Sequence, residues 1–191
     1  MPMPKPKPKN MKLKGVQFSI LQVLCLALYY GLAQFLPGRR FGRWCRYRLC
    51  RHIFQYCGQD VNIERRAHFG SGRQLRIGDH SGLGIRCDIP SNTIIGCNVM
   101  MGPDVCILPH NHHFDRTDIP MIKQGIEAPR ITTIEDDVWI GRNVMMTPGR
   151  TIRQGSIIGA GCVLTKDFEP YSIVGGNPSR LIRNRKEEVK S

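Results

Sequence analysis

Hydrophobic residues from position 77 onward recur every six positions. Two runs share this spacing, and the phase resets between them after an interruption. Their members are Ile77, Leu83, Ile89, Ile95, Met101 and Ile107, followed by Ile134, Ile140, Met146, Ile152, Ile158 and Leu164. Four residues after most of these aliphatic positions lies a second, usually small residue, such as Cys87 or Val138, and glycine often follows the aliphatic residue directly.

A six-residue repeat with these properties predicts a parallel β-helix. Each hexapeptide would supply one short strand and a turn, and three hexapeptides would close a triangular coil with the aliphatic residues inside. Glycine permits turn conformations that other residues resist. Arg150 occupies one of the small-residue positions, where a charge should not face the core, so a local distortion is expected there. The predicted fold class is all-β, with the β-helix spanning residues 61–185.

The pattern before the repeats predicts helices. Residues 15–38 contain no charge and are long enough to cross a bilayer, which needs about 20 apolar residues. Polar residues within the segment weaken that interpretation, and a helix in the membrane interface or one packed on protein fits as well. Residues 39–58 predict a second helix, in which arginines stand among aromatic residues. The whole segment 15–58 is therefore expected to be helical, and residues 1–14, where proline and lysine alternate, to be disordered.

Charge is distributed unevenly along the 191 residues. Residues 1–59 contain 11 Lys and Arg and no acidic residue, so this segment carries most of the net charge of +13. No nucleic-acid recognition motif accompanies the basic residues, and nucleic acid is therefore not expected as a partner. Basic charge beside an apolar segment is more typical of attraction to anionic lipid, which leaves open a membrane contact through residues 1–52.

The eight cysteines are scattered along the chain without a CxxC spacing. Several occupy repeat positions that favour a small apolar residue, where a thiol behaves as a small hydrophobe. No signal-peptide cleavage site is recognisable. These features indicate reduced thiols and a cytoplasmic protein, with attachment to the inner face of the cytoplasmic membrane left open.

One stretch of the repeats carries a specific resemblance. Residues 140–185 read IGRNVMMTPGRTIRQGSIIGAGCVLTKDFEPYSIVGGNPSRLIRNR and resemble the C-terminal half of hexapeptide-repeat acyltransferases. The galactoside, maltose and nodulation-factor O-acetyltransferases and related enzymes of polysaccharide biosynthesis are the most similar branch. The resemblance implies a left-handed β-helix, an exception to the usual right-handed crossover, with a short C-terminal helix. It also implies a homotrimer with active sites between subunits and acetyl-CoA as co-substrate.

The interruption of the repeat contains three histidines, in the stretch ILPHNHHFDRTDIP at residues 107–120. The resemblance implies that a loop, residues 108–133, extends from the β-helix to a neighbouring subunit and carries the catalytic base. A sugar hydroxyl needs such a base, and histidine has a suitable pKa. In the galactoside and maltose enzymes the base lies nine residues after the proline of a turn that corresponds here to Gly102-Pro103-Asp104-Val105. This spacing points to His112, with His110 as the second choice.

The same resemblance assigns residues to the two substrates. The acetyl-CoA contacts carried over are Trp139, Gly141 and Arg142 near the pantetheine, Ala160 through its backbone, Thr165 and Lys166 near the pyrophosphate and adenine, and Arg180 and Arg183 at the nucleotide phosphates. Arg142 departs from the small polar residue of the family, so its role is open. On the acceptor side Gly84 stands near the expected asparagine, which leaves Asp88 and Asn92 as candidates and does not imply galactoside-like specificity.

The predicted function is transfer of an acetyl group from acetyl-CoA to a hydroxyl of a sugar or lipid-linked saccharide in cell-envelope or capsule polysaccharide biosynthesis. The alternative is N-acetylation of an amino sugar or of a xenobiotic such as an antibiotic. Two more remote readings are a non-catalytic β-helix scaffold and a zinc-dependent hydratase like the γ-type carbonic anhydrases, with His68 or His80 as further ligands. The sequence HNHH does not reproduce the ligand spacing of those hydratases, so no metal is expected.

Overall fold

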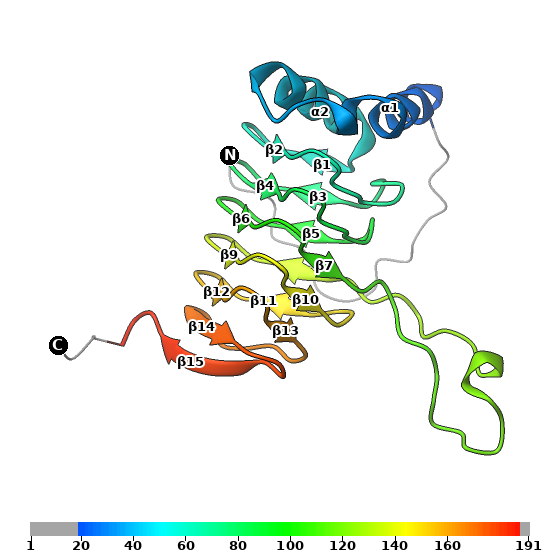
Figure 1. Ribbon diagram of the computed structural model, residues 1–191, viewed down its shortest axis with the longest axis vertical. Coiled ribbons are helices and arrows are strands. Elements are labelled where there is room, and N and C mark those ends of the chain that lie inside the picture. The colour runs from blue at the N-terminus through cyan, green and yellow to red at the C-terminus, as the bar shows by residue number, and fades with distance from the viewer. Residues whose placement is uncertain (1–18, 188–191) are drawn as a thin grey trace.

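The hexapeptide repeats form a parallel β-helix of triangular cross-section in the computed structural model, which describes residues 19–187 (Figure 1). The first face is a five-stranded ladder of β1 (Tyr56–Cys57), β3 (Arg76–Ile77), β5 (Ile94–Ile95), β8 (Thr133–Ile134) and β11 (Thr151–Ile152). Strand β5 pairs with β8 in register, although 38 residues separate Ile95 from Ile134. The long interruption is therefore accommodated without any shift of the ladder.

The second and third faces complete the triangular coil. The second contains β2 (Asn62–Ile63) and β4 (Gly82–Leu83), followed by β6 (Met100–Met101), β9 (Trp139–Ile140), β12 (Ile157–Ile158), β14 (Ser172–Gly175) and β15 (Arg180–Asn184). The third contains β7 (Cys106–Ile107), β10 (Met145–Met146) and β13 (Val163–Leu164), extended towards the N-terminus by single bridges from Cys106 to Asp88 and from Asp88 to His68. All strand pairs are parallel except β14–β15.

The periodic aliphatic residues form the core as predicted. Eleven of the twelve have buried side chains, and Met101 is half-buried. The small-residue positions are buried too, except Arg150, whose half-buried guanidinium donates to Thr165 O (3.1 Å) and lies 3.5 Å from Asp167 Oδ1. The eight cysteines are all free thiols.

The first coil begins earlier than the sequence indicated. Helix α2 ends at Ile53, and Tyr56–Cys57 already pairs with β3, within the segment expected to be helical. Gly58 directly follows β1 and allows close stacking there, because a Cβ at this position would lie 2.3 Å from Asp79 Oδ1 in the next coil. At Tyr56 and Cys57, pairing with the next coil thus determines the backbone conformation, and the expected helix does not form there.

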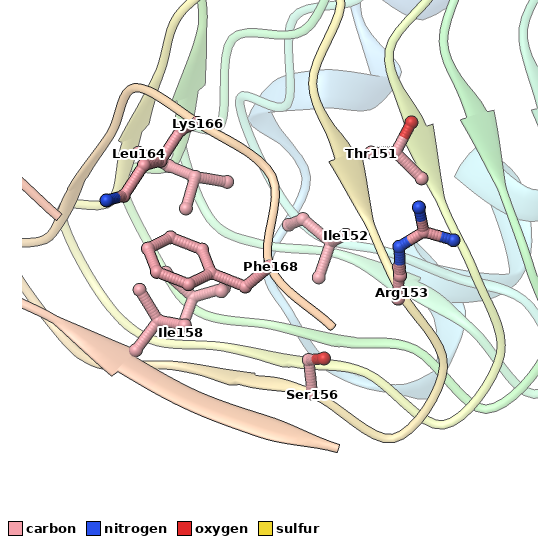
Figure 2. A pocket seen from close by; sticks show the side chains of 9 residues that line it. Thr151, Ile152, Arg153, Ser156, Ile158, Leu164, Lys166 and Phe168 are labelled. Atoms are coloured by element: carbon pink, nitrogen blue, oxygen red, sulfur yellow. The ribbon is translucent and has the colours of Figure 1, made fainter. Parts of the chain in front are cut away.

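The expected short C-terminal helix is instead a strand. Residues 180–184 form β15, which pairs antiparallel with β14 at the last edge of the second face. An uncovered parallel edge leaves backbone groups unpaired, and β15 supplies partners for them. At the same end Phe168 lies among Ile152, Ile158 and Leu164 over a small cavity that these inward-facing side chains line together with polar residues such as Ser156 (Figure 2). This cavity belongs to the closure of the core.

Helices α1 (Ile20–Gly31) and α2 (Arg40–Ile53), joined by the short 3-10 helix η1 (Ala33–Phe35), close the N-terminal end of the β-helix and are called the cap here (Figure 1). Within residues 19–187, no helix combines the length and apolarity needed to cross a bilayer. Helix α1 has 12 residues, which corresponds to about 18 Å. Of the apolar segment 15–38, the described residues from 19 onward form this short helix and the 3-10 helix η1.

Buried polar side chains of the cap bond to carbonyl oxygens of the first coil. The fully buried Arg46 donates from Nε to Ile63 O (2.6 Å) and from Nη1 to Leu36 O (2.9 Å) and Ala33 O (3.2 Å). Tyr29, also fully buried, donates its hydroxyl to Ala67 O (2.8 Å). Because an unpaired buried carbonyl is costly, these bonds determine how the cap sits on the β-helix.

We expect Arg46→Met to lower the free energy of unfolding by about 3 kcal/mol, because buried carbonyls lose a charged donor. Urea denaturation followed by circular dichroism measures the change. The matched variant Arg48→Met alters an exposed arginine of the same helix and should change the free energy by less than about 0.5 kcal/mol. Equal effects of the two substitutions would contradict the assigned role of Arg46.

Candidate functional site

The interruption of the repeat is a long irregular loop between β7 and β8 that projects from the side of the β-helix (Figure 1). Its two branches are joined where His113 N donates to Gly125 O (3.1 Å). Nearer its tip, which includes the 3-10 helix η2 (Met121–Lys123), the Gln124 amide donates to Arg116 O (2.7 Å) and accepts from Arg116 N (3.1 Å). These bonds give the loop a defined conformation and fix its histidines.

The two predicted bases lie side by side at the start of this loop. The ring centres of His110 and His112 are 6.1 Å apart, with the ring planes nearly perpendicular. His112 forms an antiparallel bridge with Ile126 across the loop and is exposed, whereas His110 is half-buried. Of the two, His112 therefore presents the more accessible imidazole in a single chain.

One edge of the β-helix connects the histidine loop to several predicted acetyl-CoA contacts. Leu108, Thr147 and Thr165 directly follow the stacked strands β7, β10 and β13, so each lies one coil beyond the last. Thr165 N donates to Ser179 Oγ (3.2 Å), and Ser179 directly precedes Arg180. The structure thus places the root of the loop, Thr165 and Arg180 along the same edge.

Two further predicted contacts share a column on the second face. Trp139 lies beside Ile157, Ile157 beside Ile173, and Ile173 beside Arg183. Three strand spacings separate the ends of this column, about 14 Å. The Trp139 side chain is half-exposed at one end and the Arg183 side chain is exposed at the other. The column is a flat apolar strip with a cation at its far end.

The corner between the second and third faces holds three more predicted contacts, Gly141, Arg142 and Ala160. A Cβ on Gly141 would lie 2.6 Å from Ala160 N, so glycine is required for close stacking at this corner. Arg142 and Ala160 are exposed there, and Arg142 O accepts from Gly161 N (2.8 Å). Lys166 lies apart from this corner, with its Nζ 5.4 Å from the Phe168 ring centre.

The predicted site residues do not form one cluster within a single chain. The histidine loop leaves the β-helix after the third face, whereas Trp139 and Arg183 lie on the second face. Glycine carries the chain between those faces at the Gly141 corner. A site that uses His112 together with Trp139 must therefore combine surfaces that one protomer keeps apart.

On the acceptor side the structure adds His68, which the sequence suggested only as a possible metal ligand. Asp88 Oδ1 lies 2.7 Å from His68 Nδ1, in the column of the third face that leads through Cys106 to the loop. The His68 ring in turn lies 5.6 Å from the ring of Tyr30 on α1. A two-residue insertion near Gly70 makes the positions of His68 and Asp88 differ by 20 rather than 18, which hides their pairing from a strict six-residue count.

The other candidates near the loop have structural partners. Asn92 Nδ2 donates to Arg130 O (3.2 Å) on the returning branch, so this amide helps to hold the loop. Burial, and secondarily the charge of Asp88, raise the pKa of the Cys106 thiol above its usual value. The thiol is therefore protonated at neutral pH and offers no nucleophile there. Within the described residues no three His, Cys, Asp or Glu side chains are grouped to hold a metal ion.

The sequence is similar to those of known acetyltransferases. Residues 131–166 match the family model described as bacterial transferase hexapeptide (six repeats). Galactoside O-acetyltransferase of Escherichia coli K12 is 31% identical over 144 residues, which cover 74% of this chain and 70% of that one. A putative acetyltransferase of Schizosaccharomyces pombe is 43% identical over 94 residues, 49% of this chain and 44% of that protein, so the chain spans under half of that relative.

The fold itself is shared with solved structures. A maltose O-acetyltransferase from Clostridium difficile superposes with a TM-score of 0.72 at 31% identity, covering 88% of this chain and 90% of that chain. The chain belongs to the hexapeptide-repeat acetyltransferase family. Another family member, an acetyltransferase of Vibrio cholerae complexed with acetyl coenzyme A, gives a TM-score of 0.62 at 27% identity, with 87% and 88% of the two chains covered.

Within this hexapeptide-repeat acetyltransferase the column of corner glycines limits what can stand on the acceptor side. A Cβ on Gly84 would lie 1.9 Å from Gly102 O. A side chain at position 84 would therefore require the two coils to separate.

We expect Gly84→Ala to lower the free energy of unfolding by about 2 kcal/mol or more, because the added methyl group overpacks two stacked coils. Gly159→Ala at the equivalent corner of a later coil is the matched control, since its Cβ would meet Val174 O at 3.3 Å. Thermal unfolding of both variants measures the difference. A Gly84→Ala protein as stable as Gly159→Ala would show that the corner has room.

Proposed function

We propose that the protein transfers an acetyl group from acetyl-CoA to a hydroxyl of a sugar or lipid-linked saccharide in cell-envelope or capsule polysaccharide biosynthesis. Family membership supports acyl transfer with acetyl-CoA as donor. The observation that carries the proposal is the common edge of the histidine loop, Thr165 and Arg180. Along this edge a base, polar groups and a cation follow one another, as attack on the thioester of an anionic donor requires.

His112 acts as the general base in this proposal. Its imidazole removes the proton of the acceptor hydroxyl while the oxygen attacks the thioester carbonyl, and the carbon–sulfur bond then breaks to release CoA. His110 lies beside it as the second candidate, and His113 N is engaged in the hydrogen bond that closes the loop. No covalent intermediate on the enzyme is needed, which agrees with the protonated Cys106 thiol near the loop.

The donor site uses the residues carried over from the family. Arg180 and Arg183 present guanidinium groups for the phosphates, where paired charge-assisted bonds are strong. Thr165 and Lys166 lie near the same end, and Trp139, Gly141 and Ala160 line the route along the second face and its corner. Arg142 stands exposed at that corner, in place of a small polar residue.

A homotrimer brings the separated groups together in this proposal. Several apolar side chains of the histidine loop are exposed in one chain: Phe114 (61%), Met121 (62%), Ile122 (85%) and Ile126 (54%). A loop with such a surface suits contact with a neighbouring subunit. It would set His112 of one subunit against the second face of the next.

On the acceptor side Asp88 and His68 provide the polar groups. Their pair is exposed, lies in the column that leads to the loop, and faces the Tyr30 ring. Such a combination of a carboxylate, an imidazole and an aromatic ring suits a hydroxyl-rich acceptor. Asn92 contributes by holding Arg130 O.

We expect acetyl-CoA to change the fluorescence emission of a Trp44→Phe protein, because Trp139 is then its sole tryptophan and lies half-exposed on the donor route. Titration of this variant gives the dissociation constant. Adding Arg180→Ala should weaken binding about tenfold or more through loss of a charge-assisted bond, whereas Arg153→Ala is the matched control. Absence of binding by the folded protein would refute the acetyltransferase proposal.

We expect His112→Ala to lower the turnover number about 10²- to 10⁴-fold, the usual contribution of a general base, with acetyl-CoA affinity unchanged. Turnover is followed as CoA thiol released with a panel of saccharide acceptors. His113→Ala is the control within the same loop, and His110→Ala tests the second candidate. A larger loss in His110→Ala than in His112→Ala would reverse the assignment.

The alternative acceptor class is an amine or an antibiotic. A chloramphenicol acetyltransferase of Agrobacterium fabrum is 52% identical over 54 residues, although these cover only 28% of this chain and 26% of that enzyme. The panel therefore includes amino sugars and chloramphenicol. Treatment of the products with hydroxylamine distinguishes an N-acetylated amino sugar from an O-acetylated acceptor, since it cleaves an ester and leaves an amide intact. Acetylated chloramphenicol is itself an ester, so mass spectrometry of the product identifies that acceptor.

A further inference from the structure

The outward side of the cap exposes several large apolar side chains together with arginines. On α1 the buried Cys25 and Tyr29 face the β-helix, and the exposed Leu24 and Leu28 lie one turn apart beside them. On α2 the buried Arg46 and Cys50 face the β-helix, and the opposite side carries an exposed stripe. The cap surface is formed by Leu24, Leu28, Phe41, Trp44, Arg48 and Arg51.

Both helices lie across the end of the β-helix, so this surface points away from it, along the direction in which the coils stack (Figure 1). Its apolar members are well exposed: Leu24 55%, Leu28 54%, Phe41 69% and Trp44 57%. Single exposed hydrophobic residues are common, but several on two helices that pack together indicate a binding surface. Burying these side chains would be favourable in any partner that offers an apolar interior.

Charge identifies which partner the cap surface fits. Exposed arginines at positions 48 and 51 belong to the surface, and Arg39, Arg40 and Arg43 lie exposed on the same helix or at its start. No acidic residue occurs between positions 19 and 59. The Arg48 guanidinium lies 5.9 Å from the Trp44 ring centre, so cation and aromatic ring are presented together. Apolar residues with Trp, Phe and Arg at their border are typical of helices in the interface of an anionic bilayer.

We propose that the cap surface binds the surface of an anionic lipid bilayer, with α1 lying in the interface rather than crossing it. Helix α1 is about 18 Å long, and a hydrocarbon core is about 30 Å thick. A second copy of the chain is a poorer occupant. A two-fold contact of this surface with itself would set Arg48 and Arg51 against their own copies, and like charges repel.

Binding in this orientation has a consequence for the proposed reaction. The third-face column passes from His68 in the first coil through Asp88 to Cys106, directly before the histidine loop. Two strand spacings therefore separate the first coil from the root of the loop, about 10 Å. An acceptor carried by a lipid would meet the site near the membrane. This consequence rests on the proposed function, whereas the lipid contact does not.

Cosedimentation of the full-length protein with lipid vesicles tests the inference. We expect binding to vesicles of phosphatidylcholine mixed with phosphatidylglycerol, little binding to phosphatidylcholine alone, and weaker binding at high salt. Each basic residue near an anionic surface changes partitioning about five-fold, so Arg48→Gln/Arg51→Gln should weaken it about 25-fold. Leu24→Gln/Leu28→Gln removes apolar contact at exposed positions and should weaken binding at both salt concentrations.

Matched control pairs lie far from the cap. Met100→Gln/Met145→Gln replaces two other exposed hydrophobic residues, and Lys123→Gln/Arg153→Gln removes two other positive charges. Both controls should bind vesicles like the wild type, and circular dichroism checks the fold of every variant. Acetyl-CoA binding is measured separately, so failure of the lipid contact is distinguishable from failure of the proposed reaction.

Three results would overturn the inference. The first is no cosedimentation of the wild-type protein with mixed vesicles, and the second is binding that neither cap pair weakens. The third is a change of oligomeric state by light scattering in Leu24→Gln/Leu28→Gln, which would show that a second copy of the chain covers the cap surface.

Discussion

Hydrogen bonds between successive coils are the constraint on which the rest of the structure depends. Strand N–H groups donate to the following coil, as Trp139 does to Ser156 (3.0 Å), whereas the N–H of the turn residue Asn98, at a positive φ, donates to the preceding coil at Asp79 (2.9 Å). Each hydrogen bond holds one residue beside a residue of the adjacent coil. Residues at equivalent positions of successive coils therefore form a column along the β-helix. The column from Trp139 to Arg183 arises in this way.

At each end of the stack, backbone groups lack a neighbouring coil to bond with, and other groups supply the missing partners. The groups that do so differ between the two ends. In the first coil the carbonyls of Ile63 and Ala67 have no coil before them, and Arg46 and Tyr29 of the cap donate to them instead. Gln34 O of the cap likewise accepts from Arg66 N in the first coil (3.0 Å). At the C-terminal end N–H groups lack acceptors. Side-chain oxygens replace the missing coil there: Asp167 Oδ1 accepts from Thr151 N and Ser179 Oγ from Thr165 N.

Periodicity explains what could be predicted from the sequence. The inward residues from Ile77 to Leu164 follow from the six-residue spacing, because each of those side chains must fill the same narrow interior. Arg46, Ser179 and strand β15 could not be predicted in this way, since each responds to an end of the stack rather than to its repeat. The pairing of His68 with Asp88 was hidden by an insertion, which changes the spacing without breaking the column. The candidate histidines were identifiable because they stand where the repeat fails.

The stacked coils hold the outward side chains at fixed spacings, and the long loop does not share this constraint. Residues in columns suit a donor of constant shape, because their spacing is set by the backbone. A base must approach a hydroxyl closely and in the right direction, and a loop outside the columns can adopt the geometry that this requires. Strands β5 and β8 pair in register on either side of the loop, so the loop can differ in length or sequence without disturbing the donor columns. The placement of the proposed base can therefore change independently of the proposed donor columns, whereas the proposed acceptor pair of Asp88 and His68 is fixed within a column of its own.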